Sequence, residues 1–91
     1  MEKVVFDRIR KDAKKLPVFI LRNLQRWAHQ VEMLGIREVR KIPGYHDESL
    51  KGDRLGQRSI RLSMGYRAIY REITEGHLIQ IRVTEVHKHD Y

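Results

Sequence analysis

Apolar residues recur at three- and four-residue intervals through the middle of the first half of the chain. The series is Ile20, Leu24, Trp27, Val31 and Leu34, widened by Leu21 and Ala28. This spacing predicts an amphipathic helix that begins at Leu16-Pro17 and ends at Gly35, with Trp27 anchored in the core. The polar residues off this stripe are predicted to face water: Arg22, Gln25, Arg26 and Gln30.

Shorter elements are predicted on both sides of this helix. The β-branched and aromatic run Lys3–Phe6 predicts a short first strand. Asp7 is suited to cap a short helix over Arg8–Lys15. Ile36, Val39 and Ile42 indicate one or two further helical turns before Pro43-Gly44.

The second half of the chain changes to a two-residue alternation, which is typical of strands. It predicts three strands, Arg58–Ser63, Tyr66–Ile73 and Leu78–Val86, with turns at Met64-Gly65 and Glu75-Gly76. The alternation fails near the end, where Glu85 takes an apolar position and Val86 a polar one. A β-bulge or a strand end near Thr84–Val86 would repair the register and would re-aim His87 and His89.

The elements together predict an α+β fold of two layers in the order β-α-α-β-β-β. An antiparallel sheet packs against a helix hairpin, and residues 1–91 form a single domain. Residues 43–57 are predicted to be a long ordered loop that leads into the sheet, and loops of that length in a small domain are usually functional.

Positive charge is concentrated in the first two strands of the predicted hairpin region. The chain has a net charge of +7, and residues 50–71 alone carry six Lys or Arg against one acid. A concentrated basic surface attracts polyanions, because neutralising phosphates releases condensed counterions. A solvated basic face without a ligand is the alternative on charge alone.

Several classes of protein are excluded or disfavoured by composition. The chain has no cysteine, which excludes disulfides, a thiolate nucleophile and Cys-based zinc sites. The longest apolar run, Val18–Leu21, is too short to cross a membrane, and the N-terminus lacks an apolar signal-peptide core. We therefore expect a cytoplasmic protein that does not interact with membranes.

The last residues carry side chains suited to proton transfer. His87, Lys88, His89 and Tyr91 lie within five positions, and His titrates near neutral pH. A solvated polar tail is the alternative. A metal site is not predicted, because His87 and His89 lack a third ligand nearby and the surroundings are cationic; His46 and Asp47 are more simply loop residues.

Arginines on adjacent predicted strands complete a possible site for RNA. Arg61, Arg67 and Arg71 can bind phosphate bidentately and remain charged, and Lys51 in a Lys-Gly turn could reach the same place. Each of them taken singly is more simply a surface charge. The chain has no acidic cluster suited to a two-metal nuclease, so cleavage would need no cofactor: the substrate 2′-OH would attack the adjacent phosphate.

Five short motifs in this order resemble the RelE/ParE superfamily of type II toxins, with the HigB- and RelE-type mRNA interferases as the nearest branch. They are the helix hairpin hinged at Leu16-Pro17, L-K-G at Leu50–Gly52, S-I-R-L at Ser59–Leu62, Y-R-x-x-Y at Tyr66–Tyr70 and the final strand with its His/Lys/Tyr tail. The resemblance covers nearly the whole chain.

The resemblance implies an endoribonuclease that cuts translated mRNA in the A site of the 30S ribosomal subunit, beside the 16S rRNA. It implies a cognate antitoxin, encoded alongside and helix-turn-helix in type, through which alone the complex would bind operator DNA. Arg61 and Arg67 become phosphate and transition-state binders, and Lys51 a backbone or phosphate contact. The other bases of this segment, Arg54, Arg58 and Arg71, are expected to bind RNA phosphates.

The proton-transfer groups implied by the resemblance are His87, Lys88, His89 and Tyr91. The general base is left open among them; His89 with Tyr91 is favoured, because both lie beyond the expected register break. Two other functions remain open. The ParE branch shares the fold, inhibits DNA gyrase without cleaving RNA and lacks the catalytic tail, and a basic RNA-binding domain without toxicity is the third.

Overall fold

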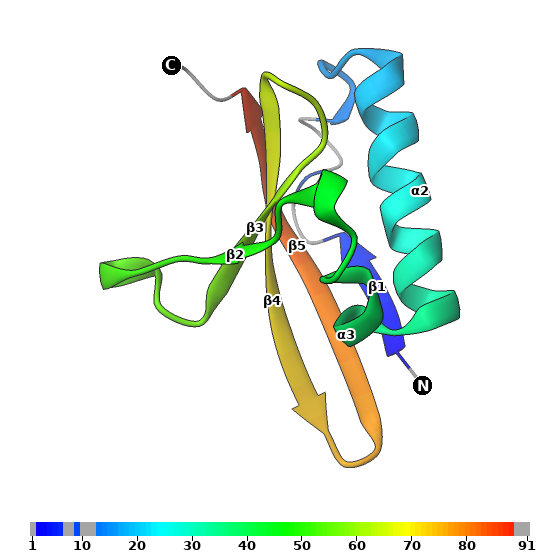
Figure 1. Ribbon diagram of the computed structural model, residues 1–91, viewed down its shortest axis with the longest axis vertical. Coiled ribbons are helices and arrows are strands. Elements are labelled where there is room, and N and C mark those ends of the chain that lie inside the picture. Colours follow the sequence, from blue (N-terminus) through cyan, green and yellow to red (C-terminus); the bar gives the residue numbers. More distant parts are fainter. Residues whose placement is uncertain (1, 7–8, 10–12, 89–91) are drawn as a thin grey trace.

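The computed structural model describes residues 2–6, 9 and 13–88 and consists of a five-stranded sheet covered on one face by helices (Figure 1). The helices are α2 (Val18–Leu34) and α3 (Ile36–Val39), and two 3-10 segments are η1 (Pro43–Tyr45) and η2 (Gly52–Arg54). The strands are β1 (Glu2–Phe6), β2 (Glu48–Ser49), β3 (Gln57–Arg61), β4 (Tyr66–Glu75) and β5 (Leu78–Lys88).

The strands lie in the order β1-β5-β4-β3-β2. The pairs β3–β4 and β4–β5 are antiparallel, as expected from their tight turns, and β2 and β3 are antiparallel too. β1 pairs with β5 in parallel, so the expectation of a wholly antiparallel sheet is wrong for this one pair. A parallel pair needs a long crossover connection, and α2 lies within the chain between these two strands. The two-layer α+β architecture is confirmed.

The core fills the space between α2, α3 and one face of the sheet. Trp27 and Tyr70 are both fully buried, and their ring centroids lie 5.3 Å apart. The core role predicted for Trp27 is therefore confirmed. The largest fully buried side chains around this pair are Ile20, Val31, Ile36, Val39, Ile60, Ile81 and Val83.

The ends of α2 follow the sequence closely. Pro17 precedes its first turn, and Gly35 ends the helix with a φ of 86°, a left-handed conformation that favours glycine. α3 is the extra helical turn expected after Gly35. The helix expected over Arg8–Lys15 lies largely outside the described residues, although the Ala13 N–H donates to the Ile9 carbonyl at 2.7 Å.

The segment expected to be a loop, residues 43–57, contains more regular structure than the sequence suggested. β2 lies within it and pairs with β3, which makes β2 an edge of the sheet. The β2–β3 hairpin, with η2 at its tip, projects away from the body of the molecule (Figure 1). A two-residue strand leaves no periodicity to detect, which explains why it was missed.

The register break near the C-terminus is a β-bulge, as the failed alternation predicted. Ile69 lies opposite Glu85, whereas the next residue, Tyr70, lies opposite Val83. Thr84 is therefore the extra residue on β5, and the faces of the strand exchange at this point.

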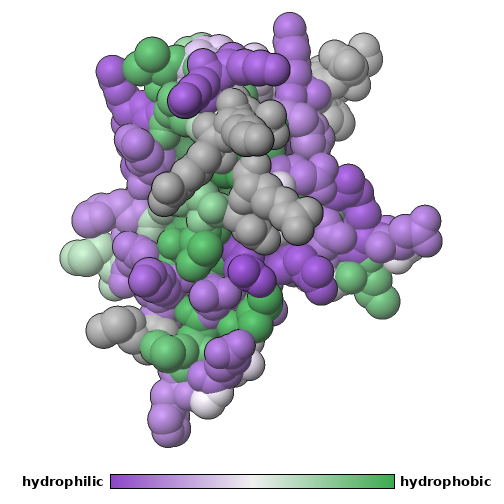
Figure 2. All heavy atoms as spheres, turned by 180° about the vertical axis from the view of Figure 1, so that it is seen from behind, coloured by the Kyte–Doolittle hydropathy of each residue, from purple (hydrophilic) through white to green (hydrophobic). Residues whose placement is uncertain are grey.

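Hydrophilic side chains cover most of the face of the molecule seen in Figure 2, with smaller hydrophobic areas between them. Within the part of the chain that the structure describes, no helix combines the length and apolar character needed to cross a bilayer.

Candidate active site

Three predicted site residues form a row across three neighbouring strands, near one end of the sheet. Arg61 on β3 lies opposite Arg67 on β4, and Arg67 lies opposite His87 on β5. Directly paired residues on neighbouring strands point to the same face of a sheet. This face is turned away from α2, since Ile60 and Ala68, the neighbours of Arg61 and Arg67, are in the core. We call it the outer face.

Arg67 is the centre of this row and is only 9% exposed. Its Nε donates to Ser59 Oγ at 2.5 Å, and its Nη2 donates to the His46 carbonyl at 3.2 Å and to Glu48 Oε1 at 3.3 Å. The guanidinium is therefore held in one orientation by Glu48 on β2, Ser59 on β3 and the His46 carbonyl, two residues before β2. A cation that is fixed in orientation and largely shielded from solvent is well suited to stabilise negative charge that develops on a phosphate.

Glu48 is a functional candidate that the sequence did not reveal. Its carboxylate lies beside Arg67, and its side chain is 57% exposed, so a substrate can reach it. It pairs with Ser59 across β2 and β3, which places it on the outer face. A carboxylate next to a bound phosphate can accept a proton. The only signal in the sequence was an acid directly before a strongly basic segment.

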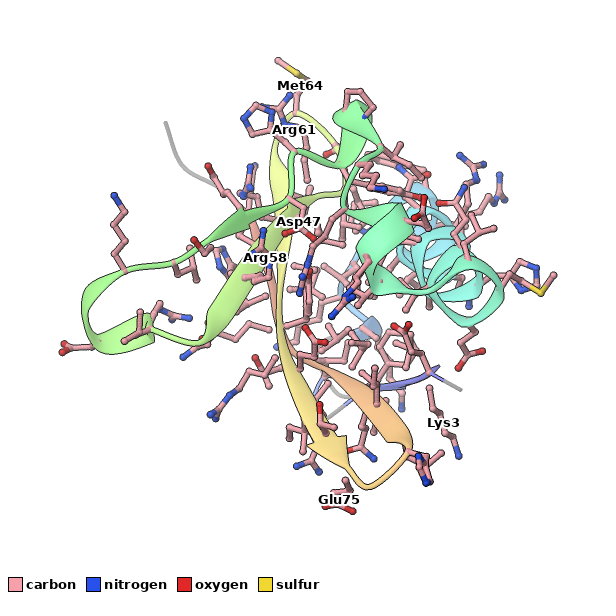
Figure 3. The ribbon with its side chains drawn as sticks, turned by 60° about the horizontal axis from the view of Figure 1, so that its bottom comes forward. Lys3, Asp47, Arg58, Arg61, Met64 and Glu75 are labelled. Atoms are coloured by element: carbon pink, nitrogen blue, oxygen red, sulfur yellow. The ribbon has the colours of Figure 1, made fainter. Side chains whose placement is uncertain are left out.

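Asp47, the neighbour of Glu48, points the other way and is almost fully buried, with 1% of its side chain exposed. Arg58 Nε donates to its Oδ1 at 2.6 Å, and Tyr70 Oη donates to its Oδ2 at 2.5 Å. Figure 3 shows Asp47 and Arg58 close together beside β3. Arg40 Nε donates in turn to the Tyr70 hydroxyl at 3.3 Å. This network fixes the residues before β2, and with them Glu48 and the His46 carbonyl.

The network also changes the ionisation of Tyr70. Burial is the largest cause that raises the pKa of its phenol above the ordinary value, and the Asp47 carboxylate adds to the rise. The phenol therefore stays protonated and donates to Asp47 throughout the physiological range. Arg58, which was expected to bind RNA phosphate, lies on the helix side of the sheet in this network and not in the outer-face row.

Arg54 occupies the outer face but is engaged by an acid. Its Nη1 donates to Glu85 Oε2 at 2.6 Å and its Nη2 to Glu85 Oε1 at 3.1 Å, a bidentate pair that ties η2 to β5. The hydrogen bond from Arg54 is the main cause that lowers the pKa of Glu85, and the charges of Arg54 and His87 lower it further. Arg54 must leave Glu85, or share it, before it can bind a phosphate.

The other predicted residues lie at different distances from the row. Arg71 lies on the outer face opposite Gln57 and Arg82, four residues after Arg67 along β4. Lys51 is exposed at the start of η2. Lys88 follows His87 on β5 and pairs with Tyr66, so it points to the opposite face. His89 and Tyr91 lie outside the described residues.

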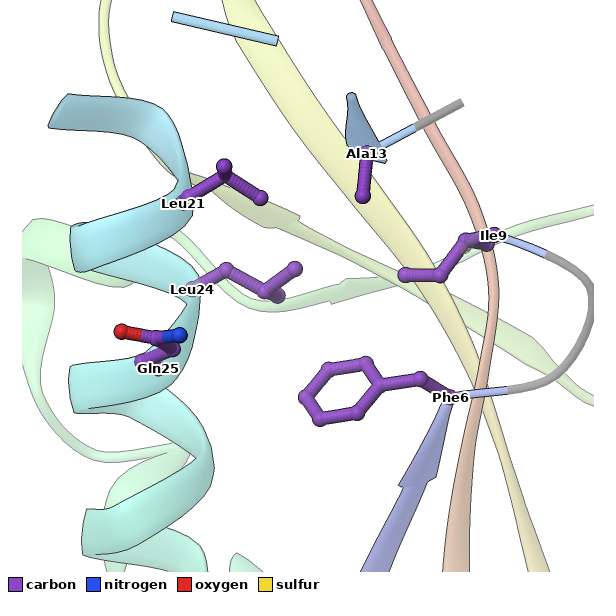
Figure 4. Close-up of a pocket in the computed structure, with 6 residues that line it drawn as sticks. All are labelled: Phe6, Ile9, Ala13, Leu21, Leu24 and Gln25. Atoms are coloured by element: carbon purple, nitrogen blue, oxygen red, sulfur yellow. The ribbon is translucent and has the colours of Figure 1, made fainter. Parts of the chain in front are cut away.

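Away from the outer face, the described residues offer no metal site and one apolar pocket. The described residues contain no group of three or more His, Asp or Glu side chains that could hold a metal ion. An apolar pocket of about 160 Å³ lies between α2 and the end of β1, lined by Phe6, Ile9, Ala13, Leu21, Leu24 and Gln25 (Figure 4). None of these six lining residues is titratable, and the pocket is separate from the outer face.

Comparison with solved structures places this fold among bacterial toxins. The YoeB/ParE toxin from Agrobacterium tumefaciens aligns over 97% of this chain and 99% of its own, with 26% identity and a TM-score of 0.58. The toxin–antitoxin complex RelBE2 from Mycobacterium tuberculosis aligns over 97% and 96%, with 26% identity and a TM-score of 0.66. The chain therefore has the fold of RelE/ParE-superfamily toxins.

A further solved structure supports the same fold. The YoeB–YefM complex from Staphylococcus aureus aligns over 100% of this chain and 99% of its own, with 16% identity and a TM-score of 0.66. No protein-family profile and no curated protein matches the sequence. The resemblance drawn from the motifs is thus confirmed for the superfamily, and assignment to the HigB branch stays a prediction.

Proposed function

We propose that this protein is the toxin of a type II toxin–antitoxin system and an endoribonuclease that cleaves translated mRNA in the ribosomal A site. The observation that carries the proposal is the row Arg61–Arg67–His87 on one sheet face, with the Glu48 carboxylate beside Arg67. The two arginines can bind phosphate, and Glu48 and His87 can exchange protons. The toxins that share the fold support the same function.

The reaction follows from the groups that the outer face offers. The scissile phosphate binds to Arg67, and the 2′-oxygen of the preceding ribose attacks it as its proton passes to Glu48 or His87. A bond forms between the 2′-oxygen and phosphorus, and the bond from phosphorus to the 5′-oxygen breaks. The leaving oxygen takes a proton from the other of these two groups, which must carry that proton when the reaction begins. The products are a 2′,3′-cyclic phosphate and a free 5′-hydroxyl, and no metal or other cofactor takes part.

The tail residues remain part of the proposal. Lys88 points away from Arg67, which makes it a weaker candidate for proton transfer than His87. His89 and Tyr91 follow directly and retain the role that the sequence predicted for them. A basic outer face also suits binding to mRNA and to 16S rRNA, whose phosphates attract clustered arginines.

We further propose a cognate antitoxin as the regulatory partner. Two of the aligned structures, RelBE2 and YoeB–YefM, are toxin–antitoxin complexes. An antitoxin that binds here must neutralise or cover the outer face, because that is where the catalytic groups converge. Contact with operator DNA would then come from the antitoxin.

Primer extension of mRNA after induction tests the proposal. Wild-type protein should produce new 5′ ends inside translated reading frames, and changing the start codon of the reporter should abolish them. Glu48→Gln and His87→Gln should each reduce cleavage by about 10²–10⁴-fold, the range typical of lost general acid–base catalysis. Both side chains are largely solvent-exposed, so folding should be unaffected.

Arg37→Gln is the matched control, since Arg37 is an exposed arginine on α3, on the other layer. It should cleave like wild type. Intact mRNA together with inhibited DNA supercoiling would instead support the gyrase inhibitor. Intact mRNA with neither effect would leave only a basic binding domain.

A further inference from the structure

A second basic site adjoins the row on the outer face. A hollow of about 330 Å³ lies where the end of β3 meets η1 and α2. The hollow is lined by Arg61 from β3, by Gly44 and Tyr45 from η1, and by Arg26 and Gln30 from α2. Figure 3 shows Arg61 at the end of the sheet opposite to Glu75, beside the ribbon of η1.

The charges of the hollow are unbalanced. Two guanidinium groups line it, from Arg26 and Arg61, and none of its lining residues carries a carboxylate. The Arg61 Nε is buried and has no hydrogen-bond partner among the described residues. Buried donors in native proteins are almost always paired, and a guanidinium pairs best with a carboxylate or a phosphate. A hollow lined by two guanidinium groups is therefore suited to an anion.

The walls of the hollow are fixed by contacts between the elements that form it. The Tyr45 hydroxyl donates to Gln30 Oε1, which ties η1 to α2. Asn23 Nδ2 donates to the Leu62 carbonyl at 2.7 Å, which ties α2 to the end of β3. At Gly44 nothing lies within 4 Å of the position that a Cβ would take, so the backbone of η1 is open to a ligand. The site is formed before any ligand binds.

We propose that this hollow binds a second phosphodiester of the RNA, next to the scissile phosphate held by Arg67. Arg61 and Arg67 are direct cross-strand partners, so the two anion sites adjoin each other on neighbouring strands. Arg61 and Arg26 then hold the neighbouring phosphate, and RNA crosses the edge of the sheet towards α2. The inference rests on the proposed function and makes Arg26 a substrate-binding residue outside the predicted basic strands.

Binding can be measured without cleavage. The probes are inorganic phosphate and an RNA trinucleotide with 2′-O-methyl riboses, which cannot attack the phosphate. In NMR titrations of the full-length protein, the Nε–H signal of Arg61 should shift and saturate with both probes. Arg26→Gln should weaken trinucleotide binding several-fold and reduce the slope of log affinity against log salt by about 0.7, the value of one lost phosphate contact on a single strand.

Arg22→Gln is the matched control. Arg22 is an exposed arginine one turn before Arg26 on α2, and it does not line the hollow. This variant should bind both probes like wild type. The inference is overturned if the Arg61 signal does not move, if Arg26→Gln binds like Arg22→Gln, or if the unphosphorylated nucleoside competes as well as phosphate does.

Cleavage of mRNA in a translation extract separates this inference from the proposed function. Arg26→Gln should raise KM for ribosome-bound mRNA several-fold with a smaller effect on kcat, whereas Glu48→Gln should lower kcat. A wild-type protein that binds the trinucleotide but never cleaves mRNA would refute the nuclease and leave the hollow as a phosphate site. Cleavage with identical KM values for Arg26→Gln and Arg22→Gln would refute the hollow and leave the nuclease.

Discussion

The buried carboxylate of Asp47 gives the sharpest test of how the site is held in place. Replacing Asp47 with Ala removes the acceptors for Arg58 Nε and for the Tyr70 O–H, while the Tyr70 oxygen still accepts from Arg40. Breaking a buried ion pair costs about 3–5 kcal/mol. The Arg58 side chain is 28% exposed and regains some hydration, which moves the value to the lower end. The lost Tyr70 bond adds about 1 kcal/mol. We expect a total of about 4 kcal/mol.

That loss is a large part of the stability of a domain of this size, which is about 5–14 kcal/mol at the usual value per residue. Urea unfolding followed by Trp27 fluorescence measures it, since Trp27 packs against Tyr70. With m of about 1–3 kcal/mol/M, the midpoint should fall by about 1–4 M. Asp47→Asn keeps one acceptor oxygen and should lose about half as much.

Asp53→Ala is the control, because Asp53 is exposed at the tip of the β2–β3 hairpin. It should change stability by less than about 0.5 kcal/mol. Asp47→Ala and Arg58→Ala should also be non-additive, since each already breaks the same pair. An Asp47→Ala variant within about 0.5 kcal/mol of wild type, or full additivity with Arg58→Ala, would refute the reasoning.

Three other predictions follow from local contacts. Gly35→Ala should destabilise the protein by about 1–2 kcal/mol in the same urea assay, because φ is 86° and the new Cβ would lie 2.7 Å from a carboxylate oxygen of Glu2, whereas Gly44→Ala should be neutral. The raised pKa of Tyr70 stabilises the folded state fully below the ordinary tyrosine pKa of about 10, and this contribution is lost as the pH rises above that value. The free energy of unfolding of the wild-type protein should therefore decrease above that pH, and it should decrease less in Tyr70→Phe. Glu85→Gln should free Arg54, so that RNA binding becomes tighter and its salt dependence steeper; unchanged binding would mean that Arg54 does not reach the RNA.

The sequence was sufficient for the elements with a clear period. The stripe through Trp27 and the alternation of the last three strands predicted α2, β3, β4 and β5 to within a few residues. It could not reveal β2, because two residues carry no period, nor the parallel direction of β1, which depends on a partner more than seventy residues away.

The candidate site was predictable only in part, for a related reason. Arg61, Arg67 and His87 could be assigned to one region because strands bring regular positions together. Glu48 and Arg26 come from an irregular segment and from the polar side of a helix, and only the tertiary structure shows that they adjoin the arginine row. The charge pattern grouped Arg58 with the other arginines. It could not show that Arg58 donates to the buried carboxylate of Asp47.

The β-bulge at Thr84 connects the fold to the chemistry. Before it, Ile81 and Val83 point into the core; after it, Val86 takes the core side, and Glu85 and His87 turn to the outer face. Were Thr84 in regular register and not bulged, strict alternation would place His87 on the helix side, away from Arg67. The bulge in β5, the strand next to the edge strand β1, thus has two effects. It keeps an apolar side chain in the core at Val86, and it brings an imidazole opposite the guanidinium that anchors the phosphate.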